Sequence, residues 1–303
     1  MTRVYGVDYQ FLSCGDVFTR GLERAARELD IVYEHALWDE PDLDFRIRTF
    51  RPDLIFVVHG RRFSQRFPNV ASFGAKTAVW LLDEPYEVDD TAQFSSRYDR
   101  VFVCDAATLH RHPRASYLPV CYDPDLHRPT TDAKKHLVGF VGGANARREQ
   151  VLAALAKAKL LSYVVGGYWS DQSVNAVCIT DNVRPVATAS LYAQTRLVVN
   201  VFREQHHYNR AGIEATAMNP RIYEALACGA LVVSEWRKEI NHRVPMLPTF
   251  RSAAECVDVI NALIAEPVSA EFVRARCADI LKRDTYADRL ATVVRLATEG
   301  VAA

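Results

Sequence analysis

The chain has 303 residues, enough for two domains of ordinary size, each with its own hydrophobic core. Its 37 basic and 37 acidic side chains balance, which excludes a global charge that would draw the protein to nucleic acid or an anionic membrane. With 49% hydrophobic and 24% charged residues, the composition is that of a globular protein.

The cysteines and the N-terminus indicate a cytoplasmic protein. Seven cysteines are scattered singly, without a C-x-x-C pair, which argues against a disulfide framework or a zinc site and favours a reducing cytosol. The first ten residues, MTRVYGVDYQ, lack the apolar region of a signal peptide. Because no stretch approaches the ~18 apolar residues of a transmembrane helix, we expect no membrane span.

The first half of the chain alternates short apolar runs with helices or loops. The runs are mostly continuous rather than alternating, which is typical of strands buried on both faces of a parallel sheet. Strands are predicted at residues 4–7, 31–33, 54–58, 77–82 and 101–104. Residues 17–29 place their apolar side chains roughly on one face of a helix.

A stretch rich in proline and polar residues follows, and we take 121–136 as a linker. The pattern then restarts, with strands predicted at 137–141, 163–165, 197–202 and 231–234. Helices are predicted at 149–158, 187–195, 220–228, 253–265, 270–283 and 286–298.

This order of elements favours an α/β fold of two Rossmann-like, doubly wound domains that face each other across a cleft. The first domain is expected over 1–120 and the second over 137–284. A C-terminal helix over 285–303 can cross back to the first domain.

Two glycine pairs follow predicted strands of the second domain: Gly142 and Gly143 in LVGFVGGANARREQVL, and Gly166 and Gly167 in VVGGYW. Such turns let backbone N–H groups approach a phosphate, and a helix N-terminus adds partial positive charge. Neither a G-x-G-x-x-G fingerprint nor a P-loop is present. Ordinary tight turns are the alternative. Two pairs at adjacent carboxyl ends of one sheet nevertheless favour a ligand there.

The stretch NPRIYEALACGALVVSEW, residues 219–236, places two charged residues at the start of a predicted helix whose other residues are mostly those of a hydrophobic core. Asn219 suits the N-cap and Pro220 the first helical position. Arg221 opposes the helix dipole unless an anion such as a diphosphate lies beside it. Glu224, one turn further, can accept two hydrogen bonds from a diol such as ribose. The alternative is an i,i+3 surface pair of Arg221 and Glu224, worth ~0.2–0.5 kcal/mol.

This stretch resembles the donor-site signature of GT-B glycosyltransferases, in particular the spore-maturation-type (CgeB-like) family. That family commonly shows Asn-x-Arg-x-(aromatic)-Glu-Ala-x-Ala-x-Gly-Ala here. Other segments agree in order: WLLDEPYE, YLPVCYDPDLHRP, GFVGGANARRE, VVGGYW, LYAQTRLVVNVFR and DTYADRL. The likeness spans roughly Thr77 to Leu290 and is strongest from Leu137 to Glu239.

The resemblance implies a hexosyl- or pentosyltransferase whose second domain binds a nucleoside-diphosphate sugar, such as a UDP-sugar, as substrate. It implies no cofactor and no metal. By position, Glu224 would bind the ribose hydroxyls, and Arg221 would lie near the diphosphate. The expected donor-binding residues are Gly142, Gly143, Asn145, Arg147, Gly166, Gly167, Asn200, Arg203, Asn219, Arg221 and Glu224. Related retaining enzymes often carry another glutamate eight positions before Glu224, where this chain has Thr216, so the sugar and the stereochemical outcome stay open.

The first domain would bind the acceptor, an unidentified hydroxyl of a glycan, a protein, a small molecule or a modified nucleic acid. Asp83 and Glu84 end one apolar strand and His59 ends another, and each can orient or deprotonate a hydroxyl. Asp16, in the first strand-to-helix loop, is the fourth catalytic candidate. A β-turn at Asp83 and Glu84, a capping box of Ser13 with Asp16, and a structural role for His59 are the alternatives.

The polar stretch REQHHYNRAGIEATAM, residues 203–218, is interpreted as a lid that orders over the bound donor. Its adjacent His206 and His207 would point apart on a regular element, which argues against a metal pair.

Two other functions stay open. One is a non-catalytic nucleotide or nucleotide-sugar binding module, which Thr216 would suit. The other is a glycosyltransferase that acts on modified DNA bases, which a small basic and aromatic patch of the first domain would suit. That patch consists of Arg61, Arg62, Phe63, Arg66 and Phe67.

Overall fold

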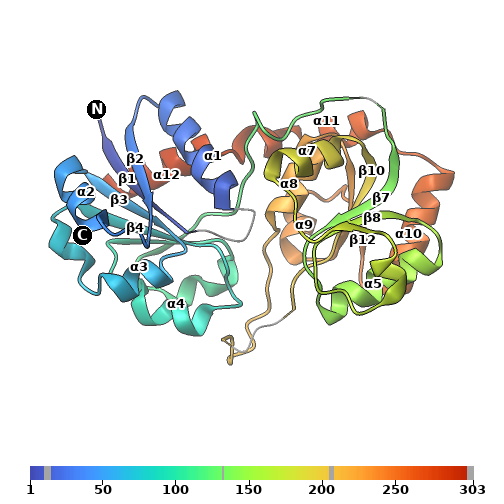
Figure 1. Ribbon diagram of the computed structural model, residues 1–303, viewed down its shortest axis with the longest axis horizontal. Coiled ribbons are helices and arrows are strands. Elements are labelled where there is room, and N and C mark those ends of the chain that lie inside the picture. Colours follow the sequence, from blue (N-terminus) through green and yellow to red (C-terminus); the bar gives the residue numbers. More distant parts are fainter. Residues whose placement is uncertain (10–14, 132, 205–207, 299–303) are drawn as a thin grey trace. The chain divides into compact units, whose positions relative to one another are not determined.

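The computed structural model describes residues 1–9, 15–131, 133–204 and 208–298. The chain divides into two compact units, each built on a six-stranded parallel sheet flanked by helices (Figure 1). The first unit comprises Met1–Cys121, Gln205–Ala217 and Asp284–Ala303, and the second comprises Tyr122–Glu204 and Met218–Arg283. The expected pair of doubly wound α/β domains is therefore confirmed, while their mutual arrangement stays a prediction.

The sheet of the first unit has the strand order β2-β1-β3-β4-β5-β6. Its strands are β1 (Arg3–Asp8), β2 (Val32–Leu37), β3 (Leu54–Val58), β4 (Lys76–Leu81), β5 (Arg100–Val103) and β6 (Ala115–Tyr117). The apolar run of β3 is buried along its whole length, as its continuous pattern predicts. The direction of winding reverses between β1 and β3, so the carboxyl ends of these two strands flank the point where open sheets bind ligands.

Helices cover both faces of this first sheet. They are α1 (Gly15–Glu28), α2 (Leu43–Phe50), α3 (Arg61–Arg66), α4 (Val88–Ser95) and α12 (Tyr286–Thr298), with 3-10 helices η1 (Val70–Phe73) and η2 (Ala106–Arg111). Helices α2, α3 and α4 contribute Ile47, Phe63 and Phe94 to a core that includes Tyr5 and Val79. Helices α1 and α12 pack against each other, and α12 also contacts β3 and β4.

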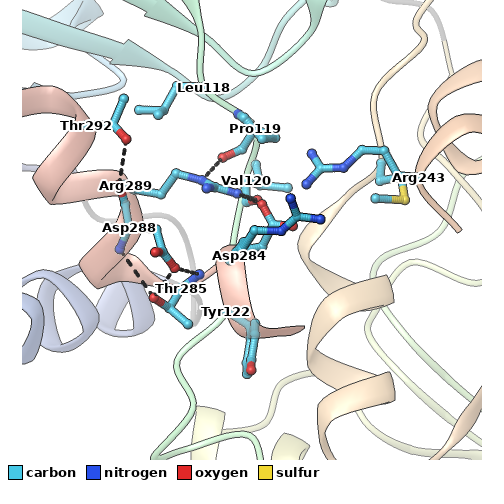
Figure 2. Close-up of polar contacts among 12 residues, drawn as sticks. Leu118, Pro119, Val120, Tyr122, Arg243, Asp284, Thr285, Asp288, Arg289 and Thr292 are labelled. Atoms are coloured by element: carbon cyan, nitrogen blue, oxygen red, sulfur yellow. Dashed lines mark hydrogen bonds and ion pairs between the residues drawn. The ribbon is translucent and has the colours of Figure 1, made fainter. Parts of the chain in front are cut away.

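The last helix is fixed to the first unit by a buried arginine (Figure 2). The guanidinium of Arg289 donates to the carbonyl oxygens of Pro119 at 2.6 Å and Val120 at 3.2 Å, and it pairs with the buried carboxylate of Asp284. Thr285 and Asp288 exchange capping hydrogen bonds at the helix start. The C-terminal helix thus belongs to the first unit, although Arg289 lies 170 residues after Pro119 along the chain.

The sheet of the second unit has the strand order β12-β11-β10-β7-β8-β9, with its reversal between β7 and β10. Its strands are β7 (His136–Val141), β8 (Leu161–Val165), β9 (Cys178–Thr180), β10 (Thr195–Asn200), β11 (Leu231–Glu235) and β12 (Thr249–Phe250). Its helices are α5 (Ala146–Lys157), α6 (Gln172–Asn175), α7 (Pro185–Ala193), α8 (Pro220–Ala227), α9 (Lys238–Arg243), α10 (Ala253–Ala265) and α11 (Ala270–Arg283).

The predicted and observed elements differ mainly where the elements are short. The predicted helices 253–265, 270–283 and 286–298 coincide with α10, α11 and α12. Strands β6, β9 and β12 have only two or three residues, too few for a hydrophobic period, and were not predicted.

One assignment from the sequence is wrong. Residues 208–217, expected in the second domain, belong to the first unit. The reason is a set of long-range hydrogen bonds that leave no local pattern, among them Asp89 N–H to Tyr208 O at 2.9 Å. None of the described helices is long and apolar enough to cross a membrane.

Candidate active site

The two glycine pairs form one backbone platform at the carboxyl edge of the second sheet. Gly142 has φ +152° and Gly166 has φ +130°, a region that side chains rarely adopt. A Cβ atom on Gly166 would lie 2.0 Å from the carbonyl oxygen of Gly142. The Ala144 N–H donates to Gly167 O at 3.0 Å, so the loops after β7 and β8 are joined directly. Glycine is required at position 166 because two backbones meet there, and at position 142 because of its positive φ.

Arg148, and not the predicted Arg147, lies on this platform. The Arg148 Nη1 donates to Gly143 O at 2.8 Å. The Arg147 side chain instead binds the Glu235 carboxylate at 2.8 Å and Arg251 O at 2.7 Å. Successive residues on a helix point about 100° apart, and the sequence alone could not choose between the two arginines. Asn145 caps α5 by accepting from the Arg148 N–H at 2.8 Å.

Arg221 lies at the reversal point of the second sheet. Its Nε donates to Val141 O, at the end of β7, at 2.9 Å, and its Nη1 donates to the Oδ1 of Asn200, at the end of β10, at 2.6 Å. Its Nη2 would be 2.8 Å from a Cβ atom on Gly142. The guanidinium therefore bridges the two strand ends and lies against the glycine platform, where helix α8 also begins.

Asn219 occupies the N-cap position of α8 as predicted, but its side chain makes no capping hydrogen bond. Its Nδ2 donates instead to Asn200 Oδ1 at 2.8 Å, and Asn200 Nδ2 donates to Ser234 Oγ at 2.9 Å. The buried Asn200 amide thus holds both Asn219 and Arg221, which fixes the start of α8 beside the sheet edge.

Glu224 lies one turn further along α8 with 16% of its side chain exposed. Its Oε1 is 3.9 Å from Nε2 of the buried His127. Burial, together with the nearby Glu224 charge, raises the pKa of the Cys228 thiol to about 12. Arg221 binds Val141 and Asn200, whereas Glu224 lies beside His127. The two charged residues of α8 therefore have different neighbours. The sequence reading did not select His127, although it lies in the segment YLPVCYDPDLHRP.

Arg203 is half-buried three residues after the end of β10. The donor residues predicted from the glycine loops, the end of β10 and the start of α8 are thus brought to one edge of one sheet. Arg147 points elsewhere.

The corresponding edge of the first sheet carries an imidazole and two carboxylates. His59, directly after β3, has Nε2 3.4 Å from an Asp83 oxygen and 3.5 Å from a Glu87 oxygen. Tyr9, directly after β1, stacks on the His59 ring with centroids 4.7 Å apart. Two of the predicted catalytic residues are therefore neighbours, and Glu87 joins them although the sequence did not single it out.

The His59 side chain is held in one place by its surroundings. It is only 8% exposed, and its backbone has φ +67°, followed by Gly60 at φ +82°. A Cβ atom on Gly60 would lie 2.5 Å from Val79, so the turn needs glycine at that position. Such strained turns persist where the surroundings enforce them, often at functional sites. The three ligand-type atoms of His59, Asp83 and Glu87 lie within 4.8 Å of one another, which a divalent ion could also use.

Glu84 and Asp16 lie in different surroundings. The Glu84 side chain is fully buried, accepts a hydrogen bond from Thr91 Oγ1 at 2.5 Å and lies 3.5 Å from His112 Nε2. Its carboxylate has no solvent-facing surface for an acceptor hydroxyl. Asp16 is exposed in the first turn of α1, while Ser13, the partner in the proposed capping box, lies outside the described residues.

The segment interpreted as a lid is attached to the first unit in its described part. The buried Asp105 carboxylate accepts from Thr216 N at 2.6 Å, Thr216 Oγ1 at 2.5 Å and Ala217 N at 2.9 Å. Asp89 accepts from the Arg210 N–H at 2.8 Å, and this bond lowers the Asp89 pKa. Thr216 therefore has a structural role at the position where related enzymes carry a glutamate. His206 and His207 lie outside the described residues.

The basic and aromatic patch of the first domain is engaged within its own unit. Arg61 pairs with Asp90 at 2.9 Å, and Arg66 donates to the carbonyl oxygens of Trp38 and Glu40. Phe63 is buried in the core. These contacts leave little of the patch to stack on nucleic acid bases.

Comparisons with known proteins identify the kind of domain. Residues 147–295 match the family model described as "Glycosyl transferase-like". The search of curated proteins returned no match.

Among solved structures, sucrose-phosphate synthase from Thermosynechococcus elongatus superposes with a TM-score of 0.71 over 97% of this chain and 98% of that one, at 12% identity. Anabaena HepE in complex with UDP-glucose gives 0.66 over 97% and 99%, at 13% identity. A UDP-forming trehalose-phosphate synthase from Burkholderia vietnamiensis gives 0.61 over 98% and 99%, at 10% identity.

Identities this low establish the fold and no more, and the fold is the GT-B architecture of these glycosyltransferases. The matched residues lie mostly in the second unit and include Gly166, Arg221 and Glu224. The chain thus has the GT-B fold, and its residues 147–295 are similar to a glycosyl transferase-like family.

Proposed function

We propose that the protein transfers a sugar from a nucleoside-diphosphate sugar to an acceptor hydroxyl, and that it belongs to the CgeB-like group of GT-B glycosyltransferases. The observation that carries the proposal is the convergence of the glycine platform, Arg148 and Arg221 at the reversal point of the second sheet. Backbone N–H groups, a helix start and guanidinium groups together favour a diphosphate. Structural neighbours that hold UDP-glucose support a UDP-sugar as the donor.

The roles within the second unit follow from the position of each group. Arg221, with the platform formed by Gly142, Gly143, Gly166 and Gly167, stabilises the charge that develops on the leaving diphosphate. Preformed donors of this kind need no rearrangement during the reaction. Glu224 accepts hydrogen bonds from the ribose diol one turn away from the diphosphate. No metal is required for either role.

The first unit supplies the base. The acceptor oxygen forms a bond to the anomeric carbon, the bond from that carbon to the diphosphate oxygen breaks, and the hydroxyl proton passes to His59. Asp83 and Glu87 lie beside His59 Nε2 and stabilise the imidazolium that results. Glu84 is too deeply buried for this role.

The test is the binding of nucleoside diphosphates to the purified protein by calorimetry. A panel of UDP, GDP, ADP, CDP and dTDP should contain at least one ligand that binds the wild-type protein. Arg221→Met and Glu224→Ala should each weaken that ligand by about 10- to 100-fold while leaving the unfolding transition in place. Lys282→Met, a change to an exposed residue of α11, is the control and should leave affinity unchanged.

Two results would contradict the proposal. Binding of none of the five diphosphates would remove the donor site. Binding without any turnover or donor hydrolysis, across a panel of nucleotide sugars, would favour the non-catalytic module. Salt-dependent retention on DNA would be needed to revive the DNA-directed alternative, which the internal contacts of Arg61, Phe63 and Arg66 disfavour.

A further inference from the structure

Tyr168 is the residue that the donor site leaves unexplained. It directly follows Gly166 and Gly167, and the residue is 98% exposed. Its backbone has φ +71°, a conformation that is unfavourable for residues other than glycine. An aromatic ring that buries almost nothing against the described part of the chain does not account for such a backbone.

The loop that presents Tyr168 is fixed on both sides. Before it, Gly167 O accepts from Ala144 N–H at 3.0 Å. After it, the buried Trp169 donates its indole N–H to Gly166 O at 2.5 Å, and Trp169 O accepts from Asn175 Nδ2 at 2.8 Å. Trp169 thus holds the loop while Tyr168 projects from it. A ring presented on a fixed backbone loses little conformational entropy when a ligand covers it.

The place of the ring relative to the glycine platform is also defined. A Cβ atom on Gly143 would lie 4.0 Å from Gly167 O, the carbonyl of the residue before Tyr168. On its other side, Gly167 faces Asp181, at the end of β9. Tyr168 therefore starts within one residue of the groups assigned to the diphosphate.

We infer that Tyr168 is a stacking platform for the nucleobase of the donor. The inference rests on the proposed function. It assigns the base of the nucleotide to Tyr168, as the diphosphate is assigned to the glycine platform and the ribose to Glu224. The base is the flat aromatic group of a nucleoside-diphosphate sugar, and a phenol ring can stack on it without reading its hydrogen-bonding edge. Tyr168 thus contributes affinity for the nucleotide, and the choice among bases is left to other groups.

The test compares a nucleotide with a ligand that has no base. The affinities of wild-type protein, Tyr168→Ala and Tyr168→Phe are measured by calorimetry for UDP, or for the diphosphate of the panel that binds best, and for inorganic pyrophosphate. Tyr168→Ala should weaken the nucleotide by roughly 5- to 100-fold and leave pyrophosphate within about twofold. Tyr168→Phe keeps the ring and should remain close to wild type.

A matched control removes another exposed aromatic side chain. Phe45 of α2, in the first unit, is 70% exposed, and Phe45→Ala should leave both affinities unchanged. If Tyr168→Ala binds the nucleotide as wild type does while Glu224→Ala weakens it, the stacking role is wrong and the donor site stands. An equal loss of pyrophosphate affinity in Tyr168→Ala would also overturn it, because the loop and not the base would then be affected. If the wild-type protein binds no nucleotide, the proposed function itself fails.

Discussion

The two sheets of this protein share one topology but present different chemistry at their carboxyl edges. In both, the winding reverses at a single point, between β1 and β3 in one and between β7 and β10 in the other. At the first edge lie an imidazole and carboxylates, His59, Asp83 and Glu87. At the second lie glycine backbones and the guanidinium of Arg221.

The difference shows how one sheet topology can carry two kinds of chemistry. In each sheet the connections after the two central strands leave toward opposite faces, which is the arrangement in which open α/β sheets bind ligands. The residues that follow the strands then decide what each crevice binds. Carboxylates beside a histidine suit a hydroxyl that must lose a proton, whereas N–H groups and guanidinium groups suit a diphosphate. The following predictions test this division, beginning with the largest expected effect.

His59→Gln should separate the two edges most sharply. Removing the proposed base should lower the rate of UDP-glucose hydrolysis, with water as the acceptor, by roughly 10²- to 10⁴-fold, because general bases contribute that much. The affinity for UDP should stay within about twofold. His110→Gln, which changes an exposed histidine of η2, serves as the control. Activity lost to EDTA and restored by Zn²⁺ or Mn²⁺ would instead assign His59, Asp83 and Glu87 to a metal.

Arg289→Met should destabilise the first unit without weakening nucleotide binding at the carboxyl edge of the second sheet. The change leaves the buried Asp284 carboxylate without its cation and the carbonyl of Pro119 without its donor, at a cost of about 3–5 kcal/mol. Denaturant unfolding measures the free energy, and calorimetry at low denaturant should still detect UDP binding. Arg20→Met, on the exposed side of α1, should change stability by less than about 0.5 kcal/mol. A similarly small effect at Arg289 would contradict the anchoring role of α12.

Gly166→Ala should affect only the carboxyl edge of the second sheet, where we propose that the donor binds. The added methyl group would collide with the backbone of Gly142, and φ +130° is closed to alanine, so a loss of about 2–3 kcal/mol is expected. UDP affinity should fall by about tenfold or more, because the platform must shift. Gly74→Ala is the control: its φ is +72° but its Cβ would meet open space, so only about 1 kcal/mol should be lost. Equal losses at the two glycines would mean that the loops do not need their close approach.

His35 should make the first unit sensitive to alkaline pH. Its hydrogen bond to Asp8, with Glu23 beside it, raises the pKa of His35 from 6.5 to about 9. The stabilisation is fully present below pH 6.5 and is lost as the pH rises through about 9, since the folded state holds the proton more tightly. Unfolding free energies at pH 6 and pH 10 should differ by about 2 kcal/mol more in the wild-type protein than in His35→Gln. Parallel pH profiles of the two proteins would disprove this coupling.

Thr216→Val should have the smallest effect. It removes one hydroxyl hydrogen bond to the buried Asp105 carboxylate, worth about 1.5 kcal/mol, and leaves the two backbone donors. Hydrogen exchange should become faster over residues 208–217, whereas Thr216→Ser should behave as wild type. Faster exchange in both variants would point to the size of the side chain rather than to its hydroxyl.

The sequence by itself determined the two doubly wound domains, most of their longer elements and most of the residues that we propose for the donor site. Continuous apolar runs fix buried parallel strands locally, and Arg221 stands out because a cation opposes a helix dipole. Gly142 and Gly166 were selected as glycines at strand-to-helix turns, whereas the close approach of Gly166 to Gly142 appears only in the structure.

Only the tertiary structure decided which side chains meet. Arg148 rather than Arg147 reaches the glycine platform, Glu87 joins His59 and Asp83, and Tyr208–Ala217 attaches to the first unit. Each of these results depends on contacts between residues far apart in the chain, for which a sequence carries no periodic signal. Hydrophobic periodicity predicts the helices and strands. Which side chains form the site depends on the strand ends that the fold brings to one edge of a sheet.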